Sequence, residues 1–137
     1  MRLDQNRARD RFAGESVARL ATVSPDLTPR IVPIVFAVSD DVVYTAVDAK
    51  PKTTTALRRL ANIAANPSVA VLADRYADDW NHLWWVRADG RAHLADEAEA
   101  ERALVLLTAR YRQYVSRPPP GPVLAIRVTR WTGWSAV

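Results

Sequence analysis

Cysteine is absent from this 137-residue chain, and histidine occurs only twice. The absence of thiols excludes disulfides, thiolate nucleophiles and cysteine-ligated metals or clusters. His82 and His93 lie too far apart for a compact two-histidine metal motif, and no Gly-x-Ser-x-Gly segment marks a serine nucleophile. We therefore expect no metal site and no catalytic side chain, and any demanding chemistry requires a bound organic cofactor.

Long hydrophobic runs are also missing. No stretch of eighteen apolar residues exists, and the charged first residues are not followed by an apolar segment. We therefore expect no membrane association and a cytoplasmic location. With 49% hydrophobic and 25% charged residues, the chain can close a modest core. Its length predicts a single domain over residues 1–137.

Lysine is scarce as well, because all but two of the 19 basic residues are arginine. The net charge of +4 is spread along the chain without a dense basic block or a recognition motif. The lysines and tryptophans do not alternate as a stacking platform would require. We therefore expect no nucleic-acid partner.

What is present predicts about six strands and two or three helices. Alternating or continuous apolar residues predict strands over residues 17–23, 30–38, 42–47, 68–73, 83–94 and 123–131. Helical spacing predicts helices over residues 3–13, 53–65 and 96–115. Residues 30–38 are apolar on both faces, which indicates a strand covered on two sides. Strands that follow one another in sequence favour a small antiparallel barrel with appended helices.

The two lysines stand together where a strand gives way to a helix. Lys50 and Lys52 precede Thr53, and Arg58 and Arg59 follow one or two turns later. Free N–H groups and the dipole at a helix N-terminus attract anions, so this segment indicates a phosphate site. The alternative is a solvated loop followed by a threonine-capped helix.

All five tryptophans lie in the second half of the chain. Adjacent Trp84 and Trp85 on a strand must face opposite sides, so one belongs to the core and the other to an interface or pocket. Trp80 lies in a polar loop, where its ring could cover a planar ligand. Packing or a subunit interface is the alternative for any single tryptophan.

The order of these pieces resembles the pyridoxamine-phosphate-oxidase-like flavin and deazaflavin proteins, the split β-barrel superfamily. The resemblance covers nearly the whole chain and is carried by residues 19–23 (RLATV), 32–36 (VPIVF), 50–60, 62–71 (NIAANPSVAV) and 89–92 (DGRA). Three further segments resemble the actinobacterial branch of F420-dependent oxidoreductases: Asp79–Trp80, Leu83–Arg87 and Trp131–Ala136.

The resemblance implies a mainly β fold, a six-stranded antiparallel split β-barrel of the FMN-binding type with appended helices. It also implies a homodimer with two cofactor sites across the subunit interface. The implied cofactor is coenzyme F420, with FMN as the alternative. The implied activity is hydride transfer between the bound coenzyme and a small conjugated organic acceptor. An FMN-binding oxidoreductase and a non-catalytic F420-binding protein are the alternatives.

The resemblance assigns cofactor-binding roles along the chain. The strand residues beside the ring are Val32, Pro33, Ile34 and Val35. The residues near the ribityl chain and phosphate are Thr45, Ala46, Lys50, Pro51, Lys52 and Thr53. Further candidates are Arg58, Arg59, Asn62 and Trp80, and tryptophans or Arg117 from the second subunit.

One departure from the family pattern concerns the phosphate. Many relatives place a phosphate-binding lysine about eight residues before the Asn/Asp-Pro that ends the helix. Here that position is Arg59, and the lysines lie further upstream. Either Lys52 or Arg59 therefore binds the phosphate. The pattern with which the oxidase binds pyridoxamine phosphate is not evident, which disfavours vitamin synthesis.

Overall fold

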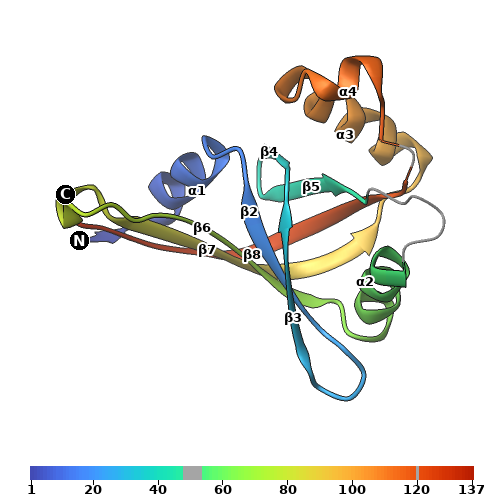
Figure 1. The fold of residues 1–137 in the computed structure, drawn as a ribbon, viewed down its shortest axis with the longest axis horizontal. Helices are drawn as coiled ribbons and strands as arrows, with labels where there is room; N and C mark the ends of the chain where they lie inside the picture. Colours follow the sequence, from blue (N-terminus) through green and yellow to red (C-terminus); the bar gives the residue numbers. More distant parts are fainter. Residues whose placement is uncertain (48–53, 120) are drawn as a thin grey trace.

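The structure, a computed structural model, describes residues 1–47, 54–119 and 121–137. Its main feature is an antiparallel sheet that curls into a split barrel (Figure 1). The described strands are β1 (Arg2–Leu3), β2 (Ala18–Val23), β3 (Pro29–Ile34), β4 (Ala37–Ser39), β5 (Val42–Ala46), β6 (Ser68–Arg75), β7 (Trp84–Leu94) and β8 (Val123–Ser135). The predicted fold class, mainly β with appended helices, is confirmed.

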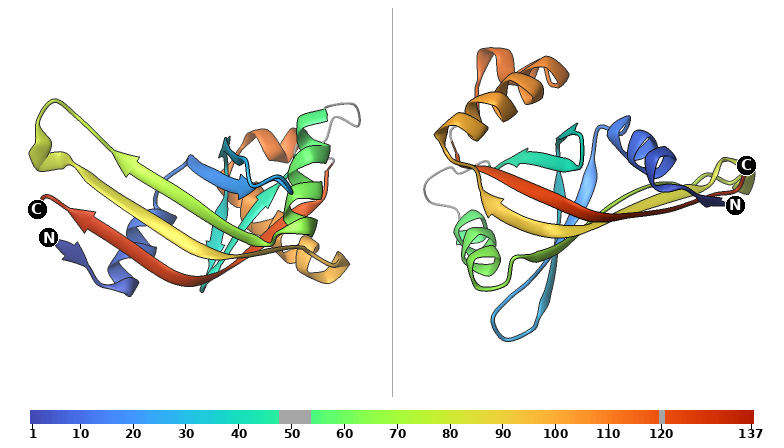
Figure 2. Two further views of the ribbon diagram at one scale, coloured as in Figure 1. Left: turned by 90° about the horizontal axis from the view of Figure 1, so that it is seen from below. Right: turned by 180° about the vertical axis from the view of Figure 1, so that it is seen from behind.

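The helices surround this sheet. They are α1 (Gln5–Ala13), α2 (Thr54–Ala65), α3 (Glu97–Arg110) and α4 (Gln113–Ser116), with a short 3-10 turn, η1 (Trp80–His82). Figure 2 shows α2 at one end of the sheet and the chain termini at the other. Within the described residues, no helix is both long and apolar enough to cross a bilayer.

The order of the strands shows how the barrel closes. Neighbours run β3, β2, β6, β7, β8, β5, β4, with β1 beside β8. β3 and β4 lie at opposite ends of this order, although only Val35 and Phe36 separate them in sequence. The prediction of one strand over residues 30–38 is therefore wrong. The chain turns a corner at Val35–Phe36, so that β3 pairs with β2 and β4 pairs with β5.

Side chains replace the missing ladder bonds at this corner. The Val35 carbonyl accepts a hydrogen bond from Thr45 Oγ1 at 2.8 Å. The Phe36 N–H donates to the Tyr111 hydroxyl at 3.0 Å, and its carbonyl accepts from Arg110 Nη1 at 2.8 Å. Because backbone polar groups must be paired when they leave a sheet, these bonds make the corner possible.

α1 packs an aromatic cluster against the barrel interior. Asp4 caps the helix by accepting from Arg7 N–H, and Ala8 and Phe12, one turn apart, are buried. The Phe12 ring lies 4.7 Å from that of Phe36 and 5.3 Å from that of Trp131. The predicted helix over residues 3–13 begins at Gln5 instead, because Arg2 and Leu3 pair with β8.

α3 covers the outer side of β4, β5 and β8. Its buried residues Ala103 and Leu107 pack against Tyr44 and Ala125. The prediction of one helix over residues 96–115 is wrong, because the backbone of Tyr111 is extended (φ −117°, ψ 107°) and the chain resumes as the single turn α4. The hydroxyl of Tyr111, at this interruption, bonds at the corner.

β6, β7 and β8 extend from the barrel toward the termini (Figure 2). β8 runs on to Ser135 instead of ending at Trp131 as predicted, because it keeps pairing with β7 and β1. The β7–β8 pairing has a register shift at Asp89/Gly90. Trp84 is buried, and Trp85 on the opposite side is half-buried, as strand alternation predicts.

Candidate functional site

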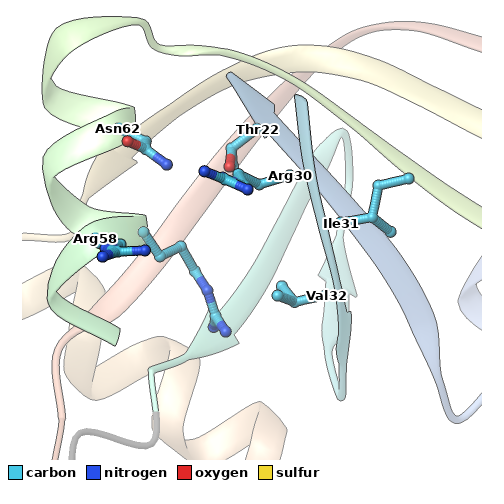
Figure 3. A pocket seen from close by; sticks show the side chains of 7 residues that line it. Thr22, Arg30, Ile31, Val32, Arg58 and Asn62 are labelled. Carbon is cyan, nitrogen blue, oxygen red and sulfur yellow. The ribbon is translucent and has the colours of Figure 1, made fainter. Parts of the chain in front are cut away.

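A cavity of about 280 Å³ lies between the β2–β3 pair and α2 (Figure 3). The residues that line it come from β2, β3 and α2, and three of them are arginines. They are Thr22, Arg30, Ile31, Val32, Arg58, Arg59 and Asn62. We call it the arginine pocket.

Strand register builds one wall of the arginine pocket. Thr22 on β2 stands directly opposite Arg30 on β3, and Leu20 stands opposite Val32. Alternate residues of a strand share a face, so Thr22, Arg30 and Val32 lie on the side of the pair that faces α2. Ile31 points to the other side of the sheet (Figure 3).

Helical spacing builds the opposite wall. Arg58 and Asn62 are four residues apart on α2, and Arg59 and Asn62 are three apart, so all three lie on neighbouring positions of one face. Asn62 is buried and its side chain extends toward the strands in Figure 3. Leu60 and Ile63 pack against the barrel core and fix the helix in this orientation.

The electrostatics of the arginine pocket favour an anion. Three guanidinium groups line it, and none of the described residues that line it is acidic. Burial lowers the pKa of Arg59, and its Nε–H has no hydrogen-bond partner among the described residues. A buried N–H without an acceptor is costly, and a phosphate or carboxylate would satisfy it through a charge-assisted hydrogen bond. The pocket can therefore hold the anionic part of a ligand.

The described residues contain no group of three or more acidic or histidine side chains that could hold a metal ion. His82 lies 3.6 Å from Asp79 in the η1 region, whereas His93 contacts Glu99 at 2.8 Å beside α3. The two histidines thus have separate carboxylate partners.

Four of the predicted cofactor-binding residues meet at the arginine pocket: Val32, Arg58, Arg59 and Asn62. The other residues predicted beside the ring diverge. Pro33 lies on the opposite, outer face and is exposed, Ile34 is buried in the core, and Val35 is half-buried at the corner.

Thr45 and Ala46 lie inside the molecule instead of lining the pocket. The Thr45 side chain is only 1% exposed, and its hydroxyl is engaged by the Val35 carbonyl. Ala46 is also buried. Within one chain, Thr45 can act on a ligand only through the strand it holds. The predicted residues Lys50, Pro51, Lys52 and Thr53 lie outside the described residues.

Trp80 is 75% exposed in η1, between the end of β6 and the start of β7. α2 leads into the other end of β6, so the length of that strand separates Trp80 from the arginine pocket (Figure 1). One copy of the chain does not bring this ring to the pocket.

Sequence reasoning missed three lining residues, Thr22, Arg30 and Ile31. Arg30 had an available signal, because it lies two residues before Val32 and therefore shares its strand face. Thr22 had none, since its position opposite Arg30 depends on the hairpin register.

A second depression, of about 550 Å³, lies on the outer face of the sheet. Ile31 borders both cavities, and exposed apolar residues surround the second one: Ile31 is 69% exposed, Tyr76 68% and Leu72 38%. Trp85 lies among them. In a single chain this side of β3 is thus uncovered. We call this surface the outer apolar face.

The chain is thus a split-barrel protein with an arginine-lined pocket beside the β2–β3 pair. The profile of the pyridoxamine 5'-phosphate oxidase family matches residues 5–135, and the chain therefore belongs to this family. No curated protein sequence matches the chain.

Solved structures share the fold at low sequence identity. A FAD-binding protein from Mesorhizobium loti has a TM-score of 0.74 and 20% identity, over 97% of this chain and 95% of that one. A conserved hypothetical protein from Mycobacterium tuberculosis has a TM-score of 0.77 and 21% identity, over 98% and 86%. A FAD-binding protein from Mycobacterium smegmatis has a TM-score of 0.68 and 23% identity, over 98% and 97%.

Proposed function

We propose that this chain is an oxidoreductase that binds coenzyme F420 and transfers a hydride between the coenzyme and a small conjugated organic acceptor. The observation that carries the proposal is the arginine pocket, in which Arg30 and the apolar Val32 share one face of β3 and Arg58 and Arg59 face them from α2. A flavin-type coenzyme needs both an anion site for its phosphate and an apolar surface for its ring.

The residues of the arginine pocket fit the phosphate of such a coenzyme. Arg30 from β3 and Arg58 and Arg59 from α2 would bind the anion from two sides. The Nε–H of Arg59 is a hydrogen-bond donor without an acceptor among the described residues, and a phosphate oxygen could accept from it. Its place in the pocket supports Arg59 as the residue that takes over from the family lysine, and Lys52 stays the alternative.

When bound, the coenzyme supplies hydride chemistry that amino-acid side chains lack. The chain contributes binding, orientation and exclusion of water. Val32 would contact the ring. Thr45 would hold the carbonyl of Val35, the residue that directly follows the same strand.

We further propose that the active form is a homodimer whose second copy completes each site. The outer apolar face adjoins the arginine pocket through Ile31 and is uncovered in one chain. Exposed apolar surfaces of this kind mark association sites. A second copy would cover the face and bring a tryptophan toward a pocket whose described lining residues include no aromatic side chain.

The same pocket also suits FMN, which makes an FMN-dependent oxidoreductase the second candidate. Family membership favours it, and two of the relatives above are described as FAD-binding proteins. A third candidate binds F420 without turnover, and only an acceptor assay separates it from the first.

The experiment is a tryptophan-fluorescence titration of the purified protein with F420, FMN and FAD in separate series. We expect saturable quenching by F420 at micromolar concentration and weaker quenching by the other two. Tight FMN or FAD binding with weak F420 binding would move the chain to the flavin candidates. Quenching by none of the three would reject the redox function. Arg59→Gln is the matched control, because it should reduce specific quenching but leave collisional quenching unchanged.

A further inference from the structure

The C-terminal end of α3 reaches across the open end of the β2–β3 pair. Ala18 and Ile34 are the last paired residues at that end. Ser16 precedes Ala18 by two residues, and Phe36 follows Ile34 by two residues. The Tyr111 hydroxyl lies 2.9 Å from the Ser16 carbonyl oxygen, 2.8 Å from the Phe36 carbonyl oxygen and 3.0 Å from the Phe36 nitrogen. One phenol thus joins both strands at the end remote from Thr22 and Arg30.

Arg110 completes the same contact. Its Nη1 donates to the Phe36 carbonyl at 2.8 Å, and its Nη2 donates to the Glu15 carbonyl. Its guanidinium also lies 5.1 Å from the centre of the Phe36 ring. A phenol has one proton and donates to one carbonyl at a time, so Arg110 keeps the Phe36 carbonyl bonded while Tyr111 donates to Ser16.

The bonded groups control where β3 lies. Phe36 is fully buried and Ile34 nearly so, and the corner between them sets the direction in which the strand leaves the barrel. Val32, which lines the arginine pocket, is two residues before Ile34 on the same strand face. A shift of the corner would therefore move Val32, while α2 and its arginines stay in place on the opposite wall.

We infer that Tyr111 and Arg110 are positioning residues for the coenzyme ring: they fix the β3 strand against which the ring lies, and they do not take part in binding the phosphate. The inference rests on the proposed function, because it concerns the same pocket. It separates the pocket into two parts: an anion end, formed by the arginines of α2 and by Arg30 near the hairpin turn, and a ring end at Val32, which is held by α3.

The test compares Tyr111→Phe with Tyr44→Phe. Tyr44 also links α3 to the barrel through its hydroxyl, which donates to Glu99 at 3.2 Å and not to the backbone of the corner residues Val35 and Phe36. Tyr44→Phe loses the hydroxyl bond to Glu99, and Tyr111→Phe loses the hydroxyl bonds to Ser16 and Phe36, so a loss of stability from deleting a hydroxyl affects both. Each is titrated with orthophosphate and with the chromophore that the wild type binds, F420, FMN or FAD.

Tyr111→Phe should leave the orthophosphate dissociation constant within about twofold and raise that of the chromophore about tenfold. The absorption band of the bound chromophore should move toward that of the free coenzyme. Amide hydrogen exchange at Phe36 should become faster, because its N–H loses its acceptor, while exchange at residues 20–22 stays unchanged. Tyr44→Phe should change none of these, and Arg110→Lys should show a smaller effect of the same kind.

An unchanged chromophore affinity and spectrum in Tyr111→Phe would overturn the inference. A parallel loss of orthophosphate and chromophore binding would also overturn it, because it would show general loosening of the pocket. A wild type that binds no chromophore would reject the proposed function and the positioning role together, so the wild-type titration distinguishes the two failures.

Discussion

Thr22 and Arg30 face each other across the β2–β3 pair, with both side chains on the face that looks toward α2. The register of the hairpin places a buried hydroxyl beside a guanidinium at the entrance of the arginine pocket. A one-residue slip would turn Arg30 to the outer face and Ile31 to the pocket. The anion site therefore depends on the hairpin as much as on its own residues.

The first prediction concerns Arg30. Arg30→Gln removes one of the three pocket charges but keeps a side chain that can hydrogen-bond. Orthophosphate and coenzyme should both bind more weakly by about 1.5–3 kcal/mol, a roughly ten- to 150-fold rise in dissociation constant. Isothermal titration calorimetry measures both ligands. Arg7→Gln, at an exposed position of α1, is the control and should bind both ligands as the wild type does. Wild-type affinity in Arg30→Gln would show that β3 is not part of the anion site.

The second prediction resolves the choice between Lys52 and Arg59. Arg59→Gln should weaken phosphate and coenzyme binding by about 1–3 kcal/mol, and Lys52→Ala should weaken it less. The ligand-free Arg59→Gln protein should melt no lower than the wild type, because the buried Nε–H of Arg59 has no partner among the described residues and adds no stability to the fold. Calorimetric titration and thermal melting together test this. A larger binding loss in Lys52→Ala would assign the phosphate to Lys52.

The third prediction uses two glycines. A Cβ on Gly90 would lie 2.4 Å from the Arg127 carbonyl oxygen, because β7 and β8 approach closely at the register shift. Gly90→Ala should destabilise the protein by about 1–3 kcal/mol, as overpacking against backbone does. On Gly14 the nearest atom is 3.6 Å away, so Gly14→Ala should stay within about 0.5 kcal/mol. Urea denaturation followed by circular dichroism measures both, and similar values would contradict the close approach.

The fourth prediction concerns the turn that joins β2 to β3. Hydrogen bonds from the Ser24 hydroxyl and from Thr28 lower the pKa of Asp26 from 3.8 to about 2. Because the folded pKa is depressed, these bonds stabilise the turn above pH 3.8, and the stabilisation is lost as the pH falls toward 2. Ser24→Ala should raise the Asp26 pKa toward 3.8, measured by an NMR titration of the carboxyl group. Ser39→Ala, at an exposed position of β4, should leave the Asp26 pKa unchanged. A wild-type pKa near 3.8 would refute the prediction.

The sequence predicts the parts of this molecule that depend on local periodicity. Alternation in Trp84 and Trp85 and helical spacing in α2 are properties of neighbouring residues, and the structure agrees with them. The corner at Val35–Phe36 is different, because its bonds come from Thr45, Arg110 and Tyr111. Continuous apolar residues there show no periodicity that could reveal the break.

The candidate site divides in the same way. Arg58, Arg59 and Asn62 are close in sequence and share a helix face, so sequence and resemblance both indicate them. Thr22 reaches the pocket only through its strand partner. Trp80 has an appropriate ring but lies at the far end of β6, because sequence gives no distance between a loop and a helix.

The last prediction tests the proposed dimer on the outer apolar face. Leu72 points outward from β6 beside Arg19 and Arg87, which are paired with Asp74 and Asp89. Leu72→Arg adds a third cation there, and in a symmetric interface the same charge comes from both copies. We expect the dimer to weaken by about 2–4 kcal/mol, a roughly 30- to 1,000-fold change. Sedimentation equilibrium measures the change.

Val105→Arg is the matched control, because Val105 is 70% exposed on α3 and does not border the outer apolar face. It should remain dimeric with unchanged coenzyme affinity. If the second copy completes each site, Leu72→Arg should lose coenzyme affinity as it dissociates while still binding orthophosphate at the arginine pocket. A dimer that survives Leu72→Arg would assign the interface to another surface. Full coenzyme affinity in a dissociated variant would instead show that one copy holds the complete site.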